Sequence, residues 1–374
     1  MRIAINTRFL LKGRMEGIGH FTWEVARRLA RQHPEHEFFF LFDRPWHPSF
    51  VPADNVYPVH LWPPARHPLL FMAWFEWAVP RALHKLRADV FLSPDNFCSL
   101  RTDVPTVLVI HDLAYRYFPK QVPWAHRAYY QYFMPRFARR ADRIVTVSEY
   151  TRQDVQRAYH IDPQCIAVAC NGCRPIFKPL SEKEIQAVRD QYAQGQPYFL
   201  FVGAVHPRKN VHRLIAAYDR FRKMSQAPVK LLIGGRFAWQ TGPVRSAWEQ
   251  ATYREDIHFL GYLDEVCLPA ITGAALALTY TSLFEGFGVP LLEAMHCEIP
   301  IIASNVSSMP EVAGPAALLV APHDVHAIAE AMLHVWQDKA LRRRLVEAGR
   351  RQRQHFSWAR AAEIVWQQIE QSVR

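Results

Sequence analysis

The chain has 374 residues, half of them apolar, which is enough for one large core or for two. No apolar run reaches the ~18 to 20 residues of a membrane span, and residues 1–6 are typical of a first strand, not of a secretory signal. Of the net charge of +11, residues 1–180 carry +9, which indicates anionic partners such as lipid headgroups, phosphorylated acceptors or nucleic acid. We expect a cytoplasmic location, and peripheral attachment to the inner face of the membrane stays open.

Short apolar runs alternate with helical patterns along the chain. This alternation predicts an α/β fold with parallel sheets and right-handed crossovers, in two successive sets. The polar stretch 171–179, with Pro and Gly, is predicted to link two domains. The predicted strands are residues 2–5, 37–42, 89–92, 106–110 and 143–147, then 198–202, 230–233, 257–260, 275–279, 299–303 and 317–320. The predicted helices include residues 19–31, 209–224, 325–336 and a last helix from about residue 357.

A glycine pair follows the first predicted strand. Gly17 and Gly19 lie where a backbone can approach a phosphate or a sugar closely. A Gly-x-Gly pair alone does not define such a site. The segment Thr7 to Met15 before it, with Arg8, Lys12 and Arg14, is expected to be a mobile loop near the ligand.

The pair His111-Asp112 directly follows the predicted strand 106–110. Ligands of α/β proteins bind at the carboxyl ends of parallel strands, so the pair is a candidate site. A lone histidine is more often structural. Two aromatic runs in the same half, residues 62–77 and 124–137, suit a membrane interface or a sugar, and core packing explains them equally well.

In the second half, the predicted strand 198–202 runs into a turn with Gly203 and then into Arg208-Lys209. Arginine binds phosphate oxygens with two parallel hydrogen bonds, and lysine adds a mobile point charge. Two cations are unfavourable at a helix N-terminus. An anionic ligand would account for them.

The most informative segment is residues 279–293, where two carboxylates, Glu285 and Glu293, flank a glycine turn. The turn consists of Gly286, Phe287 and Gly288, and Val289 opens a predicted helix with proline in its first turn. N–H groups at a helix N-terminus bind phosphate, and carboxylates accept hydrogen bonds from hydroxyl groups. Phosphate and polyhydroxyl together indicate a nucleotide sugar as the ligand.

This segment resembles a known family. Glu285, seven intervening residues and Glu293, followed by Ala294-Met295 and residues 300–304, are similar to the signature of retaining glycosyltransferase family 4, in a mannosyltransferase-like variant. The resemblance extends over nearly the whole chain. It implies the GT-B architecture, in which two Rossmann-like, doubly wound parallel-sheet domains face an interdomain cleft.

The resemblance also implies domain roles. Residues 1–175, with the C-terminal helix 357–374 crossing back onto them, are expected to form the acceptor-side domain. Residues 176–356 are expected to form the nucleotide-sugar-binding domain.

By the same resemblance, Glu285 holds hydroxyls of the transferred sugar, Glu293 holds the ribose, and the loop with Arg208 and Lys209 holds the diphosphate. Many relatives have arginine where this chain has Ala204, so whether Arg208 replaces it stays open. The expected catalytic residues are His111, Glu285, Lys209 and Arg208. The expected donor-binding residues are Gly17, Gly19, Gly203, Arg208, Lys209, Tyr262, Leu263, Glu285, Gly286, Phe287, Gly288, Val289 and Glu293.

The reaction implied is transfer of a hexose with retention of anomeric configuration. The chain has no Asp-x-Asp motif for a metal ion, so neither a metal nor another cofactor is expected. GDP-mannose is the first choice of donor, with UDP and dTDP sugars open. The acceptor is expected to be a glycan or a lipid-linked chain in surface polysaccharide or lipopolysaccharide synthesis, and no nucleic acid is expected to bind. The alternatives are another GT-B enzyme, such as a nucleotide-sugar epimerase, and a basic polyanion-binding protein without catalysis.

Overall fold

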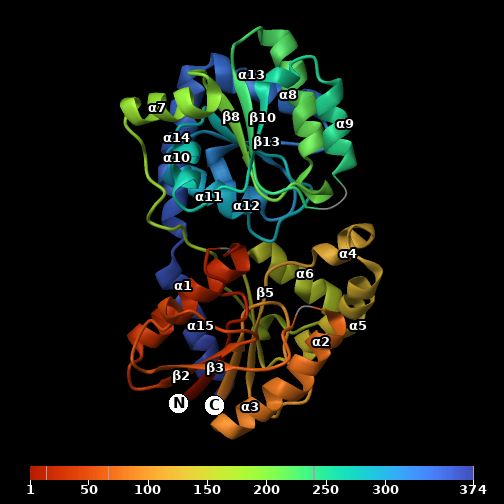
Figure 1. The fold of residues 1–374 in the computed structure, drawn as a ribbon, viewed down its shortest axis with the longest axis vertical. Helices are drawn as coiled ribbons and strands as arrows, with labels where there is room; N and C mark the ends of the chain where they lie inside the picture. Colours follow the sequence, from red (N-terminus) through yellow and green to blue (C-terminus); the bar gives the residue numbers. More distant parts are fainter. Residues whose placement is uncertain (14, 66, 239–240, 374) are drawn as a thin grey trace. The chain divides into compact units, whose positions relative to one another are not determined.

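The computed structural model describes residues 1–13, 15–65, 67–238 and 241–373. The chain divides into two compact units (Figure 1). Unit 1 consists of Met1–Gly172 and Ser357–Arg374, and unit 2 of Cys173–Phe356. Arg14 of the predicted basic loop lies outside the described residues.

Unit 1 is built on a seven-stranded parallel sheet with the order β3-β2-β1-β4-β5-β6-β7. Its strands are β1 (Arg2–Asn6), β2 (Glu37–Phe42), β3 (Val56–His60), β4 (Val90–Ser93), β5 (Thr106–Ile110), β6 (Arg143–Thr146) and β7 (Ile166–Val168). Its helices are α1 (Gly17–Gln32), α2 (Pro68–Ala73), α3 (Val79–Leu86), α4 (Ala114–Tyr117), α5 (Trp124–Arg140), α6 (Glu149–Tyr159) and α15 (Trp358–Val373), and a π-helical segment, Trp74–Ala78, joins α2 to α3.

Helices cover both faces of this sheet, with α1 and α15 on one side and α2, α3 and α5 on the other (Figure 1). Every residue of β4 and β5 is buried, as expected for parallel strands between two helix layers. Successive strand side chains point to opposite faces, so Phe39 and Leu41 of β2 join the core cluster under α2 and α3. Gly172 lies where the chain leaves unit 1, and a Cβ there would be 2.4 Å from the backbone nitrogen of Trp358.

Unit 2 has a six-stranded parallel sheet with the order β10-β9-β8-β11-β12-β13. Its strands are β8 (Tyr198–Val202), β9 (Lys230–Gly234), β10 (Ile257–Gly261), β11 (Ala277–Tyr280), β12 (Ile301–Ser304) and β13 (Ala317–Val320). Its helices are α7 (Glu182–Ala193), α8 (Val211–Ser225), α9 (Gly242–Gln250), α10 (Cys267–Gly273), α11 (Val289–His296), α12 (Met309–Ala313), α13 (Val325–Gln337) and α14 (Lys339–Gln352). In Figure 1, α8, α9 and α13 cover one face, and α10, α11 and α14 the other.

The predicted fold class is confirmed, because each unit is a Rossmann-like parallel sheet between helices and α15 packs on α1 of unit 1. Two strands were not predicted. β3 is partly exposed and contains Pro58, and β7 has only three residues. Both are edge strands, and their patterns are weak because one side of an edge strand lacks a neighbour.

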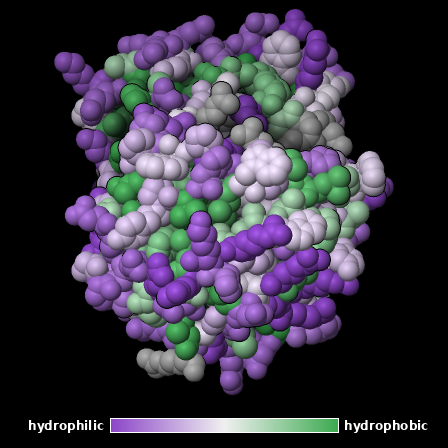
Figure 2. Space-filling view, turned by 60° about the horizontal axis from the view of Figure 1, so that its bottom comes forward, coloured by the Kyte–Doolittle hydropathy of each residue, from purple (hydrophilic) through white to green (hydrophobic). Residues whose placement is uncertain are grey.

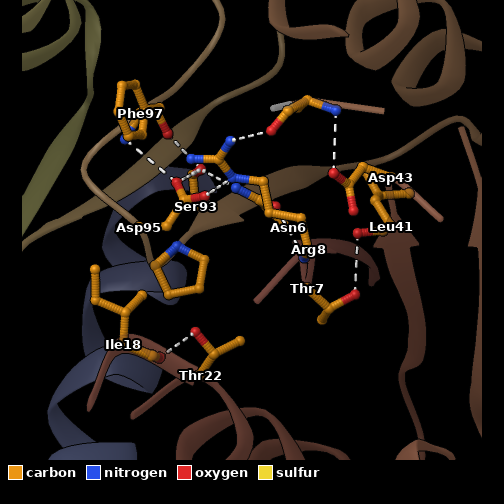
Figure 3. A network of polar contacts seen from close by, with 12 residues as sticks. Asn6, Thr7, Arg8, Ile18, Thr22, Leu41, Asp43, Ser93, Asp95 and Phe97 are labelled. Atoms are coloured by element: carbon orange, nitrogen blue, oxygen red, sulfur yellow. Dashed lines mark hydrogen bonds and ion pairs between the residues drawn. The ribbon is translucent and has the colours of Figure 1, made fainter. Parts of the chain in front are cut away.

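The loop after β1 differs from its prediction. Arg8 is only 5 % exposed and forms an ion pair with Asp95, which follows β4. Figure 3 shows the network: Asn6 donates to the Ser93 hydroxyl at 3.1 Å, and Asp43 accepts from a backbone N–H at the other end. The Arg8 guanidinium also lies 4.7–5.3 Å from the ring centroids of Phe9, Phe71, Phe75 and Phe97. The prediction of a mobile loop is therefore wrong for Arg8, which joins the ends of β1 and β4, whereas Lys12 is exposed.

The surface of one face is mixed. Figure 2 shows small hydrophobic patches separated by hydrophilic side chains. Among the described residues, no helix combines the length and the apolar composition needed to cross a membrane.

Candidate active site

The loop after β8 is held in place by close backbone contacts. Gly203 has φ +146°, and a Cβ on Gly235 would lie 1.9 Å from the Gly203 carbonyl oxygen. Only glycines allow the ends of β8 and β9 to approach this closely. The next segment, Pro207–Lys209, is one 3₁₀ turn, and α8 begins two residues later than the predicted helix. Asn210, between them, donates to the carbonyls of Thr281 (3.0 Å) and Pro322 (2.6 Å), which fixes the turn against the end of β11.

Three of the predicted catalytic side chains lie together in unit 2. The Lys209 ammonium donates to Oε1 of Glu285 at 2.5 Å and to the Tyr280 hydroxyl at 2.9 Å. Arg208 donates to the Phe284 carbonyl at 2.7 Å and lies 3.5 Å from Oε2 of Glu285. These contacts join residues 76 and 77 positions apart in sequence, because β8 and β11 are neighbours in the sheet.

The electrostatics of this group favour an anionic ligand. Burial by itself would raise the pKa of Glu285, but Lys209 and Arg208 outweigh it and lower the pKa to about 2. Glu285 is therefore ionised at neutral pH, and the two cations exceed it by one positive charge. Burial and the same two cations lower the pKa of His206 to about 4, so His206 is neutral. The net positive charge in a largely buried site suits a phosphate group.

The glycine turn after Glu285 leads directly into α11. Gly288 has φ +96°, and α11 begins at Val289 with proline in its first turn. The Glu285 N–H donates to the Ser307 hydroxyl at 3.0 Å. The Ser308 hydroxyl lies 2.9 Å from the Glu285 carbonyl and 3.1 Å from that of Phe287. The loop after β12 thus holds the turn, and the N-terminus of α11 points its N–H groups to the same end of the sheet.

The second carboxylate of the motif, Glu293, is buried in α11. It pairs with Arg174 at 3.2 Å and makes no contact with Lys209 among the described residues. Burial raises the pKa of Glu293, and Arg174 acts in the opposite direction. Tyr262 and Leu263, predicted to bind the donor, follow β10, and Tyr262 is 54 % exposed.

The remaining predicted residues belong to unit 1. Gly17 and Gly19 form the first turn of α1, not a loop before it, and a Cβ on Gly19 would lie 2.6 Å from the Phe9 carbonyl oxygen. A Cβ on Gly17 would meet nothing within 4 Å. The His111 ring packs edge-on against Phe21 of α1.

His111 has a defined protonation state. Its Nε2 lies 2.8 Å from the Pro94 carbonyl, which can only accept, so Nε2 carries the proton. Burial lowers the pKa of His111, so the ring is neutral and Nδ1 is an acceptor. A neutral imidazole of this kind can position a hydroxyl group.

Sequence analysis missed several side chains of the site. Tyr280 ends β11 directly before the motif, which could have suggested it. Ser307 and Ser308 follow β12 and show no pattern of their own. Arg174 lies in the predicted linker, 119 positions before Glu293, and no local signal joins the two.

Comparisons with known proteins identify the family of the chain. The family model described as "Glycosyltransferase Family 4" matches residues 15–175, and that described as "Glycosyl transferases group 1" matches residues 182–352. The chain is 30% identical over 361 residues to O-antigen chain mannosyltransferase B of Escherichia coli, covering 93% of this chain and 94% of that protein.

Two solved structures of similar fold illustrate the match. The first is WaaG, a glycosyltransferase involved in lipopolysaccharide biosynthesis, with a TM-score of 0.79, 17% identity and coverage of 98% and 99% of the two chains. The second is Anabaena HepE in complex with UDP and glucose, with a TM-score of 0.76, 17% identity and coverage of 99% and 100%. On the strength of the family models and of the mannosyltransferase relative, the chain belongs to glycosyltransferase family 4.

Proposed function

We propose that this enzyme transfers mannose from GDP-mannose to a hydroxyl group of a glycan or lipid-linked acceptor, with retention of configuration and without a metal ion. The observation that carries the proposal is the group of Arg208, Lys209 and Glu285 beside the N-terminus of α11. The likeness to an O-antigen mannosyltransferase supports mannose as the sugar and a surface polysaccharide as the product. HepE, of similar fold, binds UDP, which keeps UDP sugars as alternative donors.

The two cations suit the charge that develops on the leaving group. When the bond between the anomeric carbon and the phosphate oxygen breaks, the diphosphate gains negative charge, and preorganised cations and N–H groups stabilise it. Lys209 has a flexible stem and can turn from Glu285 to a phosphate oxygen, while Arg208 is held by the Phe284 carbonyl. This arrangement does the work that a bound metal ion performs in metal-dependent transferases.

The reaction balances within the donor and acceptor. The acceptor oxygen forms a bond to the anomeric carbon on the face that the nucleoside diphosphate leaves, and the acceptor proton passes to the leaving phosphate oxygen. No protein nucleophile is needed. Glu285, ionised because of its cations, accepts hydrogen bonds from hydroxyls of the transferred sugar. In unit 1, the open acceptor Nδ1 of His111 is assigned a hydrogen bond from a substrate hydroxyl.

Nucleotide binding and turnover test the proposal. Thermal unfolding with GDP, UDP, dTDP and ADP should show stabilisation by one nucleotide, unchanged by EDTA, of ~2.7 kcal/mol at a hundred times the dissociation constant. Glu285→Ala and Lys209→Ala should each remove most transferase activity without unfolding the protein. The control Lys183→Ala, at an exposed position of α7, should keep wild-type activity. Near-normal turnover in both site variants would refute the assignment of Glu285 and Lys209 to the active site. Salt-steep binding to any polyanion, with no nucleotide preference, would favour a noncatalytic binding protein.

We also propose that unit 1 binds an anionic membrane surface. Trp62 and Trp124 are each 79 % exposed, and Leu69 is 69 % exposed. The rings of His67 and His126 are 6.4 Å apart, so the start of α2, with Leu69, lies beside the start of α5, with Trp124. Aromatic side chains on a basic domain suit a lipid interface. Co-sedimentation with vesicles containing anionic lipid should weaken severalfold in Trp62→Ser/Trp124→Ser, and equal binding of the variant would refute the assignment.

A further inference from the structure

Arg174 connects two separate parts of unit 2. One guanidinium nitrogen, Nη2, lies 3.2 Å from Oε1 of Glu293 in α11, and the other, Nη1, lies 3.2 Å from Oε1 of Glu265. Glu265 belongs to the loop after β10 that begins with Tyr262. The guanidinium also lies 5.1 Å from the ring of Phe177, and its side chain is 14 % exposed.

Arg174 opposes the effect of burial on Glu293, which raises the pKa of that carboxyl. The carboxylate side chain is only 7 % exposed, and no second salt bridge to it occurs within the described parts of the chain. An unpaired carboxylate at such a site takes up a proton in preference to remaining charged. The glutamate alone would therefore be a poor hydrogen-bond acceptor for hydroxyl groups at neutral pH.

The contact also leaves part of Glu293 available. Arg174 approaches Oε1, and Oε2 has no hydrogen-bond partner among the described residues. A charged carboxylate with one anchored oxygen and one open oxygen can accept a hydrogen bond from a ligand in a defined direction. The second contact of Arg174, with Glu265, anchors the loop that begins with Tyr262.

We propose that Arg174 is a positioning residue for the nucleoside half of the donor: it favours the charged form of Glu293, aims Oε2 at the ribose hydroxyls, and holds the loop of Glu265 beside the base. This inference rests on the proposed function, because it assumes a nucleoside diphosphate in this unit. Arg174 lies in the segment that was predicted only to link the domains, and the inference gives it a role in donor recognition.

The test compares ribose with a sugar that lacks its hydroxyls. Calorimetric titration of the nucleoside diphosphate that the wild-type protein binds, and of its 2′,3′-dideoxy form, gives a ribose preference. In the wild type this preference should be about 10- to 100-fold, the effect of a hydrogen bond to a charged group. In Arg174→Met it should fall to within about threefold at pH 7.5, whereas Arg245→Met, at an exposed position of α9, should keep the wild-type value.

The pH profile separates positioning from a merely structural role. Because the loss of Arg174 removes the cation that opposes protonation of Glu293, the ribose preference of Arg174→Met should increase as the pH rises from 6 to 9. The wild-type preference should change less over that range. Arg174→Lys keeps the positive charge, so it should retain most of the preference, and it replaces Arg174→Met if the latter does not fold.

The outcomes distinguish the two proposals. If the wild type binds no nucleoside diphosphate, the proposed function fails. If it binds one with a ribose preference that Arg174→Met leaves intact and independent of pH, the role of Arg174 is overturned while the function stands. If Arg174→Lys also loses the ribose preference, the positive charge of residue 174 is not sufficient, and its proposed role is refuted.

Discussion

Replacement of Lys209 by methionine removes the ammonium group 2.5 Å from Oε1 of Glu285 but keeps an unbranched side chain of similar bulk. Among the described residues, the carboxylate then keeps Arg208, at 3.5 Å, as its ion-pair partner. We expect the variant to fold with lower stability and to lose donor binding. The substitution tests whether the ion pair with Lys209 keeps Glu285 ionised.

The magnitude follows from the pKa. The two cations lower the pKa of Glu285 from 4.5 to about 2 against the opposing effect of burial. At 1.36 kcal/mol per pKa unit, this shift corresponds to about 3 kcal/mol of stability at neutral pH. Since Lys209 is the stronger of the two influences, most of that stability should disappear in Lys209→Met.

The pH dependence has a definite sign. Glu285 has a lower pKa in the folded than in the unfolded chain, so its contribution is complete above about pH 5 and is lost as the pH falls towards 2. The stability difference between wild type and Lys209→Met should therefore be largest near pH 7 and shrink in acid. A difference that grows in acid would contradict this sign.

A double-mutant cycle gives the coupling directly. Urea unfolding of the wild type, Lys209→Met, Glu285→Gln and the double variant at pH 7 should show a coupling free energy of about 2 to 3 kcal/mol. Because two-domain proteins often unfold in more than one step, the values come from the transition that Lys209→Met shifts. Coupling below about 0.5 kcal/mol would refute the electrostatic account of the site.

Three further substitutions follow, of which two test the packing and one tests the donor site. Arg8→Met leaves Asp95 buried without its partner and should cost about 3 to 5 kcal/mol in urea unfolding, and the double variant with Asp95→Leu should recover much of it; a loss below 1 kcal/mol would show that the pair is dispensable. Gly235→Ala should lower the melting temperature by many degrees, since its Cβ would meet a carbonyl oxygen at 1.9 Å, whereas Gly242→Ala, with open space, should not. Gly17→Ala should leave the melting temperature unchanged but raise KM for the donor; an unchanged KM would remove Gly17 from the site.

Local patterns in the sequence were sufficient for most of the fold. Buried parallel strands such as β5 and β8 are continuous apolar runs, and their length and flanking turns identify them. The segment from β11 to α11 is also local, so the glycine turn and both glutamates could be placed on it. The edge strands β3 and β7 were missed, because a strand with one neighbour needs less apolar surface.

The contacts within the site depend on the tertiary structure. Lys209 contacts Glu285 because β8 and β11 are adjacent in the sheet. The order of strands in the sheet cannot be predicted from the sequence of either strand alone. Arg8, basic and close to a glycine turn, looked exposed, yet the ends of β1 and β4 bury it against Asp95. Arg174 reaches Glu293 across 119 positions. The sequence by itself determined which local elements form and which residue types they carry, because short-range sterics and hydrophobic periodicity act within a few residues. Only the packing of strands against one another decided which loops meet, and hence which charges are paired.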